Sequence, residues 1–329
     1  MEDVQALLGG LFNVALVIMI VATMFAAGLM TTTKALGSVF KNVVLVLLVL
    51  FTALILRPLV GWGLAALFSL GTASYIAMLL LAACPGAPLG AKFVMNAKGD
   101  LTTGASLQVL TAALGSITFP IVANLMIGSA GLGEDISLPV GDLIKAVAFL
   151  QLVPFAVGIG VRHWTPQSAE EWNPTATQIS TYTLLIVVAL ALLGSFVIMI
   201  DLIGDRVILA GVLFPAIMLV VGWFVATGDT ATRKATALIE PGSNAGPVFA
   251  AVAIAFDNDP ELLGVVTVLI FLQIVVGTLA ASYLGKGGGE EDAPADDIPA
   301  DGTPAEAQPE GGSEEEAPAD DTPAEAQPA

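Results

Sequence analysis

Nine long apolar stretches follow one another along the first 286 residues of the chain. They cover residues 7–30, 41–67, 73–97, 102–127, 140–162, 177–200, 206–226, 231–256 and 262–284. A helix needs about 20 consecutive apolar residues to cross a bilayer, and each stretch is long enough. Hydrophobic residues make up 56% of the chain and charged residues only 12%, against roughly 25% charged in a soluble domain. The sequence therefore predicts an all-α polytopic membrane protein with about nine transmembrane helices.

Acidic residues are concentrated at the C-terminal end. Of the 29 Asp and Glu residues, 14 follow Gly287, where there is no Lys or Arg, so most of the net charge of −18 belongs to residues 287–329. This segment is rich in Pro, Ala and Glu, has no aromatic residue and repeats Ala-Pro-Ala-Asp-Asp at 293–297 and 317–321. Such a composition buries too little apolar surface to offset the entropy of ordering. We predict a disordered acidic tail after a membrane domain of residues 1–286, and the shortage of basic residues argues against a nucleic-acid partner.

Basic residues are distributed unevenly over the connections between the predicted spans. One side, which includes the C-terminal flank, carries Lys34, Lys41, Lys98, Arg162, Arg233, Lys234 and Lys286. The other side carries only Lys145 and Arg206 and collects acidic residues. Lys and Arg favour the cytoplasmic side of a membrane, and nine spans place the two termini on opposite sides. We therefore predict a protein of the cytoplasmic (inner) membrane with its N-terminus outside and its C-terminal tail in the cytoplasm.

Two of the predicted spans are interrupted near their middle by proline and glycine. The interruption in 73–97 contains Pro85, Gly86, Pro88 and Gly90, and the one in 231–256 contains Pro241 and Gly242. Proline removes a backbone donor and glycine permits unwinding, and unwound backbone at membrane depth persists only in protein or beside a cavity. Paired interruptions in two halves of a chain indicate a secondary transporter built from inverted repeats. For either interruption alone, a kinked structural helix is the alternative.

Three stretches resemble signatures of the bile acid:sodium symporter family. Residues 83–100, which contain Cys-Pro-Gly-Ala and end in Lys-Gly-Asp, resemble its Cys-Pro-Gly-Gly…Ser-Asn…Gly-Asn/Asp signature. Residues 233–244 resemble its Glu-x-Gly-x-Gln-Asn crossover, and residues 24–29 resemble its first core-facing glycine helix. The resemblance covers residues 10–285 and implies two inverted five-helix repeats, the first without its leading helix, whose broken helices cross. It also implies a panel of spans 7–30, 140–162 and 177–200 and a core of spans 41–67, 73–97, 102–127, 206–226, 231–256 and 262–284.

In that family, two sodium ions are bound beside the crossing by side-chain and backbone oxygens, which are the ligands that a hard cation needs. Carried over residue by residue, Glu240 matches the glutamate of the family. Further side-chain oxygens come from Gln108, Ser243 and Asn244, whereas the Ser-Asn pair of the family falls on residues 90–91, which have none. The resemblance thus implies Na⁺ ligands at Glu240 and Gln108, with the sodium sites partly lost, and a proton is the alternative coupling ion.

Three charged residues are expected inside the membrane. An unpaired charge is unfavourable there, so we expect the crossing to pair Lys92 with Glu240 and the Lys92 ammonium to replace one sodium ion. The alternative is that Lys92 extends toward the cytoplasmic surface. Arg57 is expected either to bind an anionic substrate through its planar guanidinium or to form a structural pair. Asn96 and Gln273 are polar residues at membrane depth that we place near the same binding site, and the alternative is that they form interhelical hydrogen bonds.

These features predict a secondary active transporter that moves a small organic anion by alternating access. Half-helix N-termini that face the crossing favour an anionic ligand. The alternatives are a sodium-independent, proton- or ion-coupled antiporter of similar fold and a membrane receptor that binds its ligand without moving it. No nucleophile–base pair is visible, so we do not expect an enzyme, and we expect no cofactor apart from Na⁺ or H⁺. The expected partners are the lipid bilayer and the anion, and the sequence indicates no particular oligomeric state.

Overall fold

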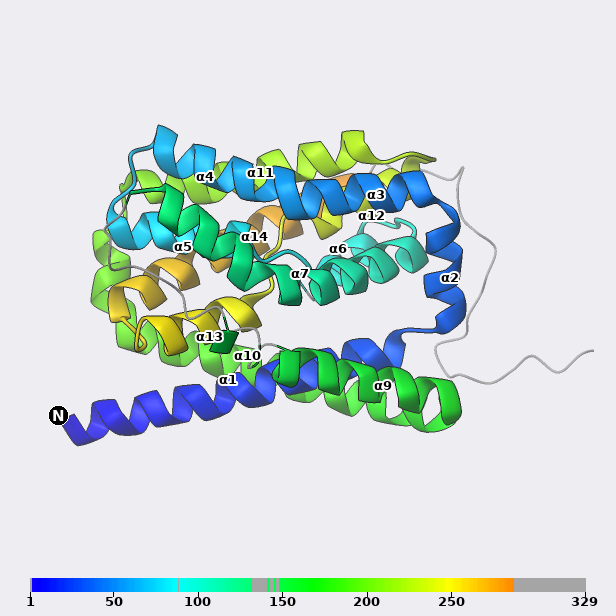
Figure 1. Cartoon of the computed structure of the whole chain (residues 1–329), viewed down its shortest axis with the longest axis horizontal. Coiled ribbons are helices and arrows are strands. Elements are labelled where there is room, and N and C mark those ends of the chain that lie inside the picture. Colours follow the sequence, from blue (N-terminus) through cyan, green and yellow to red (C-terminus); the bar gives the residue numbers. More distant parts are fainter. Residues whose placement is uncertain (1, 88, 132–140, 143–144, 146–147, 287–329) are drawn as a thin grey trace, which may run out of the picture. The chain divides into compact units, whose positions relative to one another are not determined.

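The computed structural model of the chain describes residues 2–87, 89–131, 141–142, 145 and 148–286, and the elements assigned within them are all helices (Figure 1). Pro88 and the predicted tail, 287–329, lie outside the described residues. The elements are α1 (Glu2–Met30), α2 (Thr33–Lys41), α3 (Val43–Phe51), η1 (Thr52–Leu56), α4 (Arg57–Leu67), α5 (Thr72–Ala82), α6 (Gly90–Asn96), α7 (Leu101–Ser129), η2 (Ala148–Leu152), α9 (Val153–Trp164), α10 (Pro166–Asp201), α11 (Arg206–Val225), α12 (Thr230–Ile239), α13 (Ala245–Ala255) and α14 (Pro260–Lys286). They belong to one compact unit, Met1–Gly289.

Aspartate side chains cap the first turn of several helices. Asp100 caps α7 and Asp205 caps α11, by accepting backbone N–H groups at 3.0 and 2.9 Å. Asp229 caps α12 by accepting the N–H of Thr232 at 2.8 Å. Such caps satisfy backbone donors that have no partner within the helix. Hydrogen bonds from Thr232 hold the pKa of Asp229 below its usual range, so the cap is ionised at neutral pH.

Within the described residues, five helical segments are long and apolar enough to cross a membrane. They are Gly10–Met30, Val43–Leu67, Leu101–Ser129, Arg206–Val225 and Pro260–Lys286. The predicted spans 140–162 and 177–200 fall on η2–α9 and on α10. The structure thus supports a helical membrane protein, while the count of nine crossing helices and the inverted repeats stay predictions.

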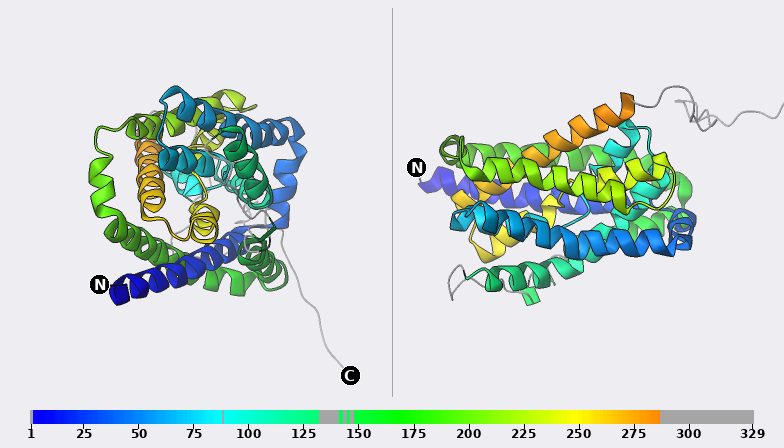
Figure 2. Two further views of the ribbon diagram at one scale, coloured as in Figure 1. Left: turned by 60° about the vertical axis from the view of Figure 1, so that its left-hand side comes forward. Right: turned by 90° about the horizontal axis from the view of Figure 1, so that it is seen from above.

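The two remaining predicted spans are each divided into two shorter helices. α5 ends at Ala82 and α6 begins at Gly90, while α12 ends at Ile239 and α13 begins at Ala245. Both interruptions fall at the proline and glycine residues that the sequence singled out. Residues 74–82 of α5 and 234–239 of α12 are buried throughout. Figure 2 shows the two broken helices, in cyan and yellow, among the other helices of this unit.

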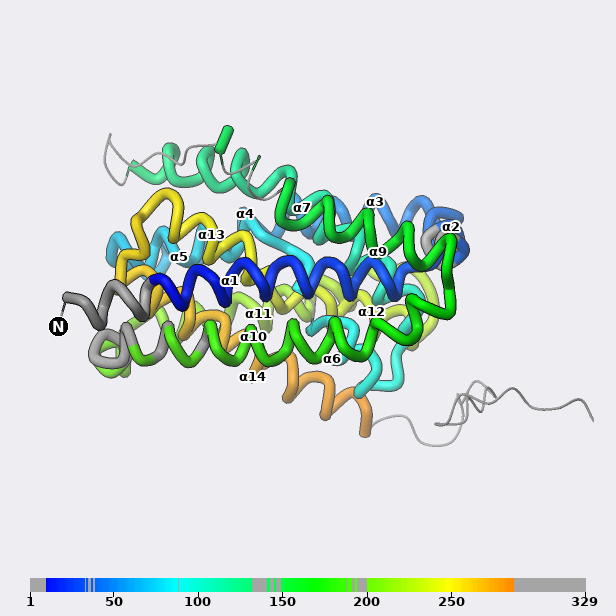
Figure 3. Tube along the Cα trace, turned by 90° about the horizontal axis from the view of Figure 1, so that it is seen from below, coloured from blue at the N-terminus to red at the C-terminus, as the bar shows by residue number. Residues whose placement is uncertain are grey.

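Helix α1 packs mainly against α9 and α10 and lies between them in Figure 3. At its crossing with α9, a Cβ on Gly28 would lie 2.9 Å from the Cα of Gly158, and a Cβ on Gly158 would lie 2.9 Å from the Cα of Gly28. Small residues allow such close backbone contact between membrane helices. The hydroxyls of Thr23 and Ser180 are hydrogen-bonded at 2.5 Å and link α1 to α10. The division of the helices into panel and core stays a prediction.

Two π-helical turns, η1 and η2, interrupt otherwise regular helices just before a proline. Pro58 and Pro154 come after them, and a proline displaces the carbonyl of the residue four positions earlier. Those residues, Leu54 and Leu150, lie inside η1 and η2. A π turn takes up one extra residue and so rotates the rest of the helix by about 100° relative to a regular α-helix. Arg57, the residue after η1, is redirected in this way.

Candidate functional site

The two broken helices are in contact where they unwind. The backbone N–H of Asn244 donates to the carbonyl of Cys84 at 3.0 Å, and the hydroxyl of Ser243 donates to the carbonyl of Leu81 at 2.8 Å. On either side of this contact, α6 packs against α12 and α5 packs against α13. The two unwound segments therefore cross and satisfy part of each other's backbone hydrogen bonding. We call this place the crossing and define it by residues 83–87 and 240–244.

Two glycines allow the close approach at the crossing. Gly86 has a φ of +87°, and a Cβ there would lie 2.5 Å from the backbone nitrogen of Ala112 in α7. Gly242 lies so close to the methyl group of Ala87 that a Cβ would overlap it. A side chain at either position would push the segments apart. The other predicted break residues that the structure describes, Pro85, Gly90 and Pro241, are buried.

Arg57 reaches the crossing from the first turn of α4 and is fully buried, with 0% of the residue exposed. Its Nη1 donates to the carbonyl of Glu240, and its Nη2 donates to the hydroxyl of Ser243 at 2.6 Å. The guanidinium carbon lies 5.0 Å from the centre of the Phe214 ring in α11, which is a cation–π arrangement. These contacts are those of the structural one of the two roles expected from the sequence, and the substrate role stays a prediction.

Glu240 and Gln273 complete this cluster of polar groups. Only 3% of Glu240 is exposed, and its Cγ would lie 3.1 Å from a Cβ on Gly222 of α11. Its carboxylate forms no hydrogen bond or ion pair with the residues that the structure describes, but its charge interacts with that of Arg57. Gln273 of α14 accepts the backbone N–H of Ser243 at 2.8 Å. The structure thus gathers four of the predicted site residues around the second break.

Asn244 also lies at the crossing, where it acts as a cap. Its side-chain oxygen accepts the N–H of Gly246 at 3.3 Å and so caps α13. Asn244 is 6% exposed. Its side-chain oxygen and its backbone N–H are therefore both bonded within the protein, which leaves it a positioning role in this structure.

Lys92 does not pair with Glu240, so the expected pair is wrong. Lys92 is exposed on α6, and no ion pair links it to any residue in the described ranges. The buried face of α6 is set by Phe93 and Val94, which leaves Lys92 on the outer face. Asn96, four positions later, lies on that same face and is also exposed. The positive charge beside Glu240 is supplied by Arg57 instead.

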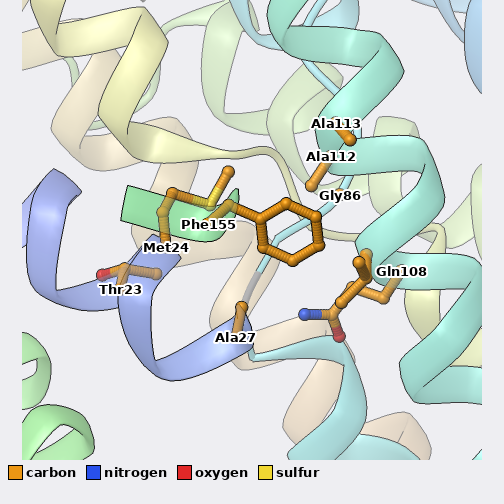
Figure 4. Close-up of a pocket in the computed structure, with 9 residues that line it drawn as sticks. Thr23, Met24, Ala27, Gly86, Gln108, Ala112, Ala113 and Phe155 are labelled. Atoms are coloured by element: carbon orange, nitrogen blue, oxygen red, sulfur yellow. The ribbon is translucent and has the colours of Figure 1, made fainter. Parts of the chain in front are cut away.

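Gln108 lies on α7, away from this cluster, beside a small cavity. Its Oε1 accepts the backbone N–H of Ala91, at the start of α6, at 2.6 Å. Because that N–H needs an acceptor, the amide NH₂ of Gln108 must occupy the other side, and Figure 4 shows it directed into the space between α1 and α7. The cavity, of about 20 Å³, is lined by Thr23, Met24, Ala27, Gly86, Gln108, Val109, Ala112, Ala113 and Phe155.

The sequence did not point to Thr23 or Phe155 as lining residues. In Figure 4 the Phe155 ring from α9 lies between Met24 of α1 and Gln108 of α7. Thr23 immediately precedes the stretch 24–29 that resembles a core-facing helix, and Phe155 follows the proline after η2. Their positions next to the stretch 24–29 and next to Pro154 are the sequence features from which these two residues could have been predicted. The cavity joins α1 and α9 to α7 and the first break, and its volume suits about one water molecule.

The model of the Sodium Bile acid symporter family matches residues 17–204, which is more than half of the chain. The chain belongs to this family. The matched range runs from α1 to just beyond α10 and contains the first break, while the second break lies beyond it. Among curated proteins, none matches the chain. With its long apolar helices, this family member is an integral membrane protein that lies in a lipid bilayer. Members of the family are transporters of small solutes, in line with the expectation that the chain is not an enzyme.

In this symporter family member, three of the four side chains expected to bind sodium already use their oxygen to accept a hydrogen bond within the protein, and the carboxylate of Glu240 does not. Ser243 Oγ accepts from Arg57, Gln108 Oε1 from Ala91 and Asn244 Oδ1 from Gly246. The backbone carbonyl of Glu240 is also bonded to Arg57. A sodium ion needs several oxygens around it, and among the four expected ligands the carboxylate of Glu240 alone accepts no hydrogen bond from the described residues, so this arrangement does not present a complete sodium site at the crossing. Nor do the described residues contain a group of three or more His, Cys, Asp or Glu side chains able to hold a metal ion.

Proposed function

We propose that this member of the Sodium Bile acid symporter family is a secondary transporter that carries a small organic anion by alternating access. The observation that carries the proposal is the hydrogen-bonded contact of two unwound segments, through Asn244 and Cys84, in a protein with membrane-length helices. In secondary transporters, broken helices of this kind mark the substrate and ion site. The family match supports transport of a small solute. We propose that the contact between the two broken helices at the crossing changes during transport.

The substrate position that we propose is the cavity beside Gln108. Its free amide N–H groups are donors that suit the oxygens of a carboxylate or sulfonate. A cavity of about 20 Å³ is too small for an organic anion, so this conformation would be an occluded one. Admission of the substrate would require α1 and α9 to move away from α7.

A second candidate is a sodium-independent antiporter that exchanges the anion for a proton or another ion. The observation that favours it is the state of Glu240, a residue only 3% exposed whose carboxylate forms no hydrogen bond or ion pair with the described residues. A carboxylate in that position can take up and release a proton when the crossing opens and closes. The oxygens around it are engaged by protein donors, so no step through sodium is assigned.

The arrangement in the membrane is part of the same proposal. We propose nine crossing helices in inverted repeats, with the N-terminus outside and the C-terminal tail cytoplasmic. We also propose that α1, α9 and α10 form a panel that moves relative to the other helices. The mutual packing of α1 with α9 and α10 supports this grouping, and the close contact of Gly28 with Gly158 would make α1 and α9 move together.

Counterflow in proteoliposomes tests the proposed function. A thermal-shift screen of carboxylates and sulfonates on the purified full chain first identifies an anion that raises its melting temperature. Vesicles loaded with that anion are then diluted into a trace of the labelled compound. We expect transient accumulation of label inside the vesicles and none in protein-free vesicles. Saturable binding by the purified protein without counterflow would identify a receptor and contradict the proposal.

A further inference from the structure

Two helix C-termini and one carboxylate bring negative charge to part of the crossing. The half-helices α5 and α12 both end there, at Ala82 and Ile239. The last carbonyl groups of a helix lack partners within it and carry partial negative charge. The carboxylate of Glu240 lies beside the end of α12. Unwound carbonyls and half-helix C-termini are the groups with which transporters bind cations, so a positive charge is favourable beside these two helix ends.

Arg57 already supplies a positive charge at this place. Its guanidinium donates to the carbonyl of Glu240 and to the hydroxyl of Ser243, one backbone and one side-chain oxygen of the second break. Arginine stays charged in proteins, and with 0% of the residue exposed this charge is held inside the protein. The hydroxyl of Ser243 links Arg57 to the first broken helix as well, because it donates in turn to the carbonyl of Leu81 at the end of α5.

The side chain of Arg57 is positioned for this contact by its own helix and by α11. The π turn η1 redirects Arg57, whose backbone N–H donates to the carbonyl of Thr52 across that turn. The ring of Phe214 lies 5.0 Å from the guanidinium carbon and covers one side of the charge. Ser243 is held separately, by Gln273. The guanidinium therefore meets oxygens that are fixed by other contacts.

We propose that the Arg57 guanidinium is a resident cation of the crossing, which replaces a dissolved cation and keeps the two broken helices in contact without sodium. The inference deepens the proposed function and rests on it only in treating the crossing as the ion site of the transporter. It explains why the hydroxyl of Ser243, one of the oxygens expected to hold sodium, accepts a hydrogen bond from a cationic side chain. It also gives the crossing a positive charge that cannot dissociate, whereas a sodium ion would have to be taken up in each transport cycle.

The test compares the melting temperature of the purified full chain in sodium, potassium and choline chloride at one ionic strength. The four tryptophans of the chain allow the transition to be followed by fluorescence. We expect the wild-type melting temperature to agree within about 1 °C in the three salts, since only an ion that binds the native state raises it. A saturable rise in sodium alone would overturn the proposal.

Chemical rescue supplies the decisive variant. Arg57→Ala removes the guanidinium and should lower the melting temperature by at least about 3 °C. Guanidinium ion at millimolar concentration, far below its denaturing range, should restore part of this loss in Arg57→Ala and leave the wild type unchanged. The matched control is Arg206→Ala, which removes an exposed arginine bonded to the carbonyl of Phe68 at 3.2 Å and should show no rescue. Equal responses of Arg57→Ala and Arg206→Ala would overturn the proposal.

A further variant covers failure of Arg57→Ala to fold. Arg57→Lys keeps the charge and loses the planar pair of donors, so it should melt lower than the wild type and remain indifferent to sodium. A saturable rise in the melting temperature of Arg57→Lys with sodium, but not with potassium or choline, would contradict the proposal. Because melting is measured on purified protein, these results are separate from counterflow. A protein without counterflow can still support or overturn the role of Arg57.

Discussion

Ser243 uses its hydroxyl and its backbone N–H to connect four parts of the chain. The hydroxyl accepts from Arg57 of α4 and donates to the carbonyl of Leu81 at the end of α5, while the N–H donates to Gln273 of α14. A hydroxyl both donates and accepts, which a methyl group cannot do. Serine at this position therefore joins the resident charge to both broken helices.

We expect Ser243→Ala to destabilise the protein by about 1–3 kcal/mol, because it leaves a buried guanidinium donor and a buried carbonyl without their shared partner. The measurement is the denaturation midpoint of the purified chain. The matched control is Ser129→Ala at the exposed end of α7, where the hydroxyl donates to Met126 at 2.9 Å; that change should stay within about 0.5 kcal/mol. Equal stability of Ser243→Ala and the wild type would show that the hydroxyl is not required.

A substitution at Gln108 is expected to weaken substrate binding while the protein still folds. In Gln108→Glu, one carboxylate oxygen can still accept the N–H of Ala91, but the donor that faces the cavity becomes an anionic oxygen. We expect the affinity for the anion to fall by about 10-fold or more, the value of a lost charge-assisted hydrogen bond, with the fold retained. Titration of the melting temperature with the anion measures this.

The control for Gln108→Glu is Thr118→Val on the same helix. The hydroxyl of Thr118 bonds within α7, to the carbonyl of Leu114 at 3.1 Å, and it does not line the cavity. Thr118→Val should therefore leave anion affinity unchanged. Unaltered affinity in Gln108→Glu would move the proposed substrate position away from Gln108.

Helices and their interruptions are the level at which the sequence is most informative here. Apolar length placed α7, α11 and α14 within a few residues of their observed ends. Proline and glycine placed both breaks, because a missing backbone donor and a position such as Gly86, with φ of +87°, act locally. These are properties of a residue and its near neighbours, so a single sequence carries them.

The partner of Glu240 depends on information that local patterns do not contain. Lys92 was the expected partner because it is close to the first break in the sequence. The rotation of α6 is decided by burial of Phe93 and Val94, which turns Lys92 outward. Arg57 reaches Glu240 from a distant part of the chain, after a π turn that shifts its direction. Neither the helix rotation nor the π turn is visible in apolar periodicity.

Between elements, the close contact of α1 with α9 gives a prediction about packing. Gly28→Ala would place a Cβ 2.9 Å from the Cα of Gly158, so the helices must separate, and we expect a loss of about 1–3 kcal/mol. Gly10→Ala is the control on the same helix, because a Cβ there meets nothing within 4 Å. It should be neutral or stabilise the helix by up to about 1 kcal/mol. The denaturation midpoint should therefore fall in Gly28→Ala and stay the same or rise in Gly10→Ala, and equal losses in the two variants would contradict close packing of α1 on α9.

For the whole molecule, the number of crossings and the orientation are linked by parity. Lys34 follows the first predicted span and Glu261 follows the eighth, so seven spans separate them. An odd number places the two positions on opposite sides of the membrane. The excess of basic residues assigns the side of Lys34 to the cytoplasm. Both the span count and the orientation can thus be examined with one pair of labelled positions.

We expect an impermeant maleimide to label Glu261→Cys on intact cells and Lys34→Cys only after the membrane is opened. Both positions are exposed, and the single native cysteine, Cys84, is 1% exposed, so the unmodified chain serves as the unlabelled control. Labelling of Lys34→Cys alone on intact cells would keep the odd count and reverse the orientation. Labelling of both from the same side would require an even number of crossings between them, and one of the seven predicted spans would then not cross the membrane.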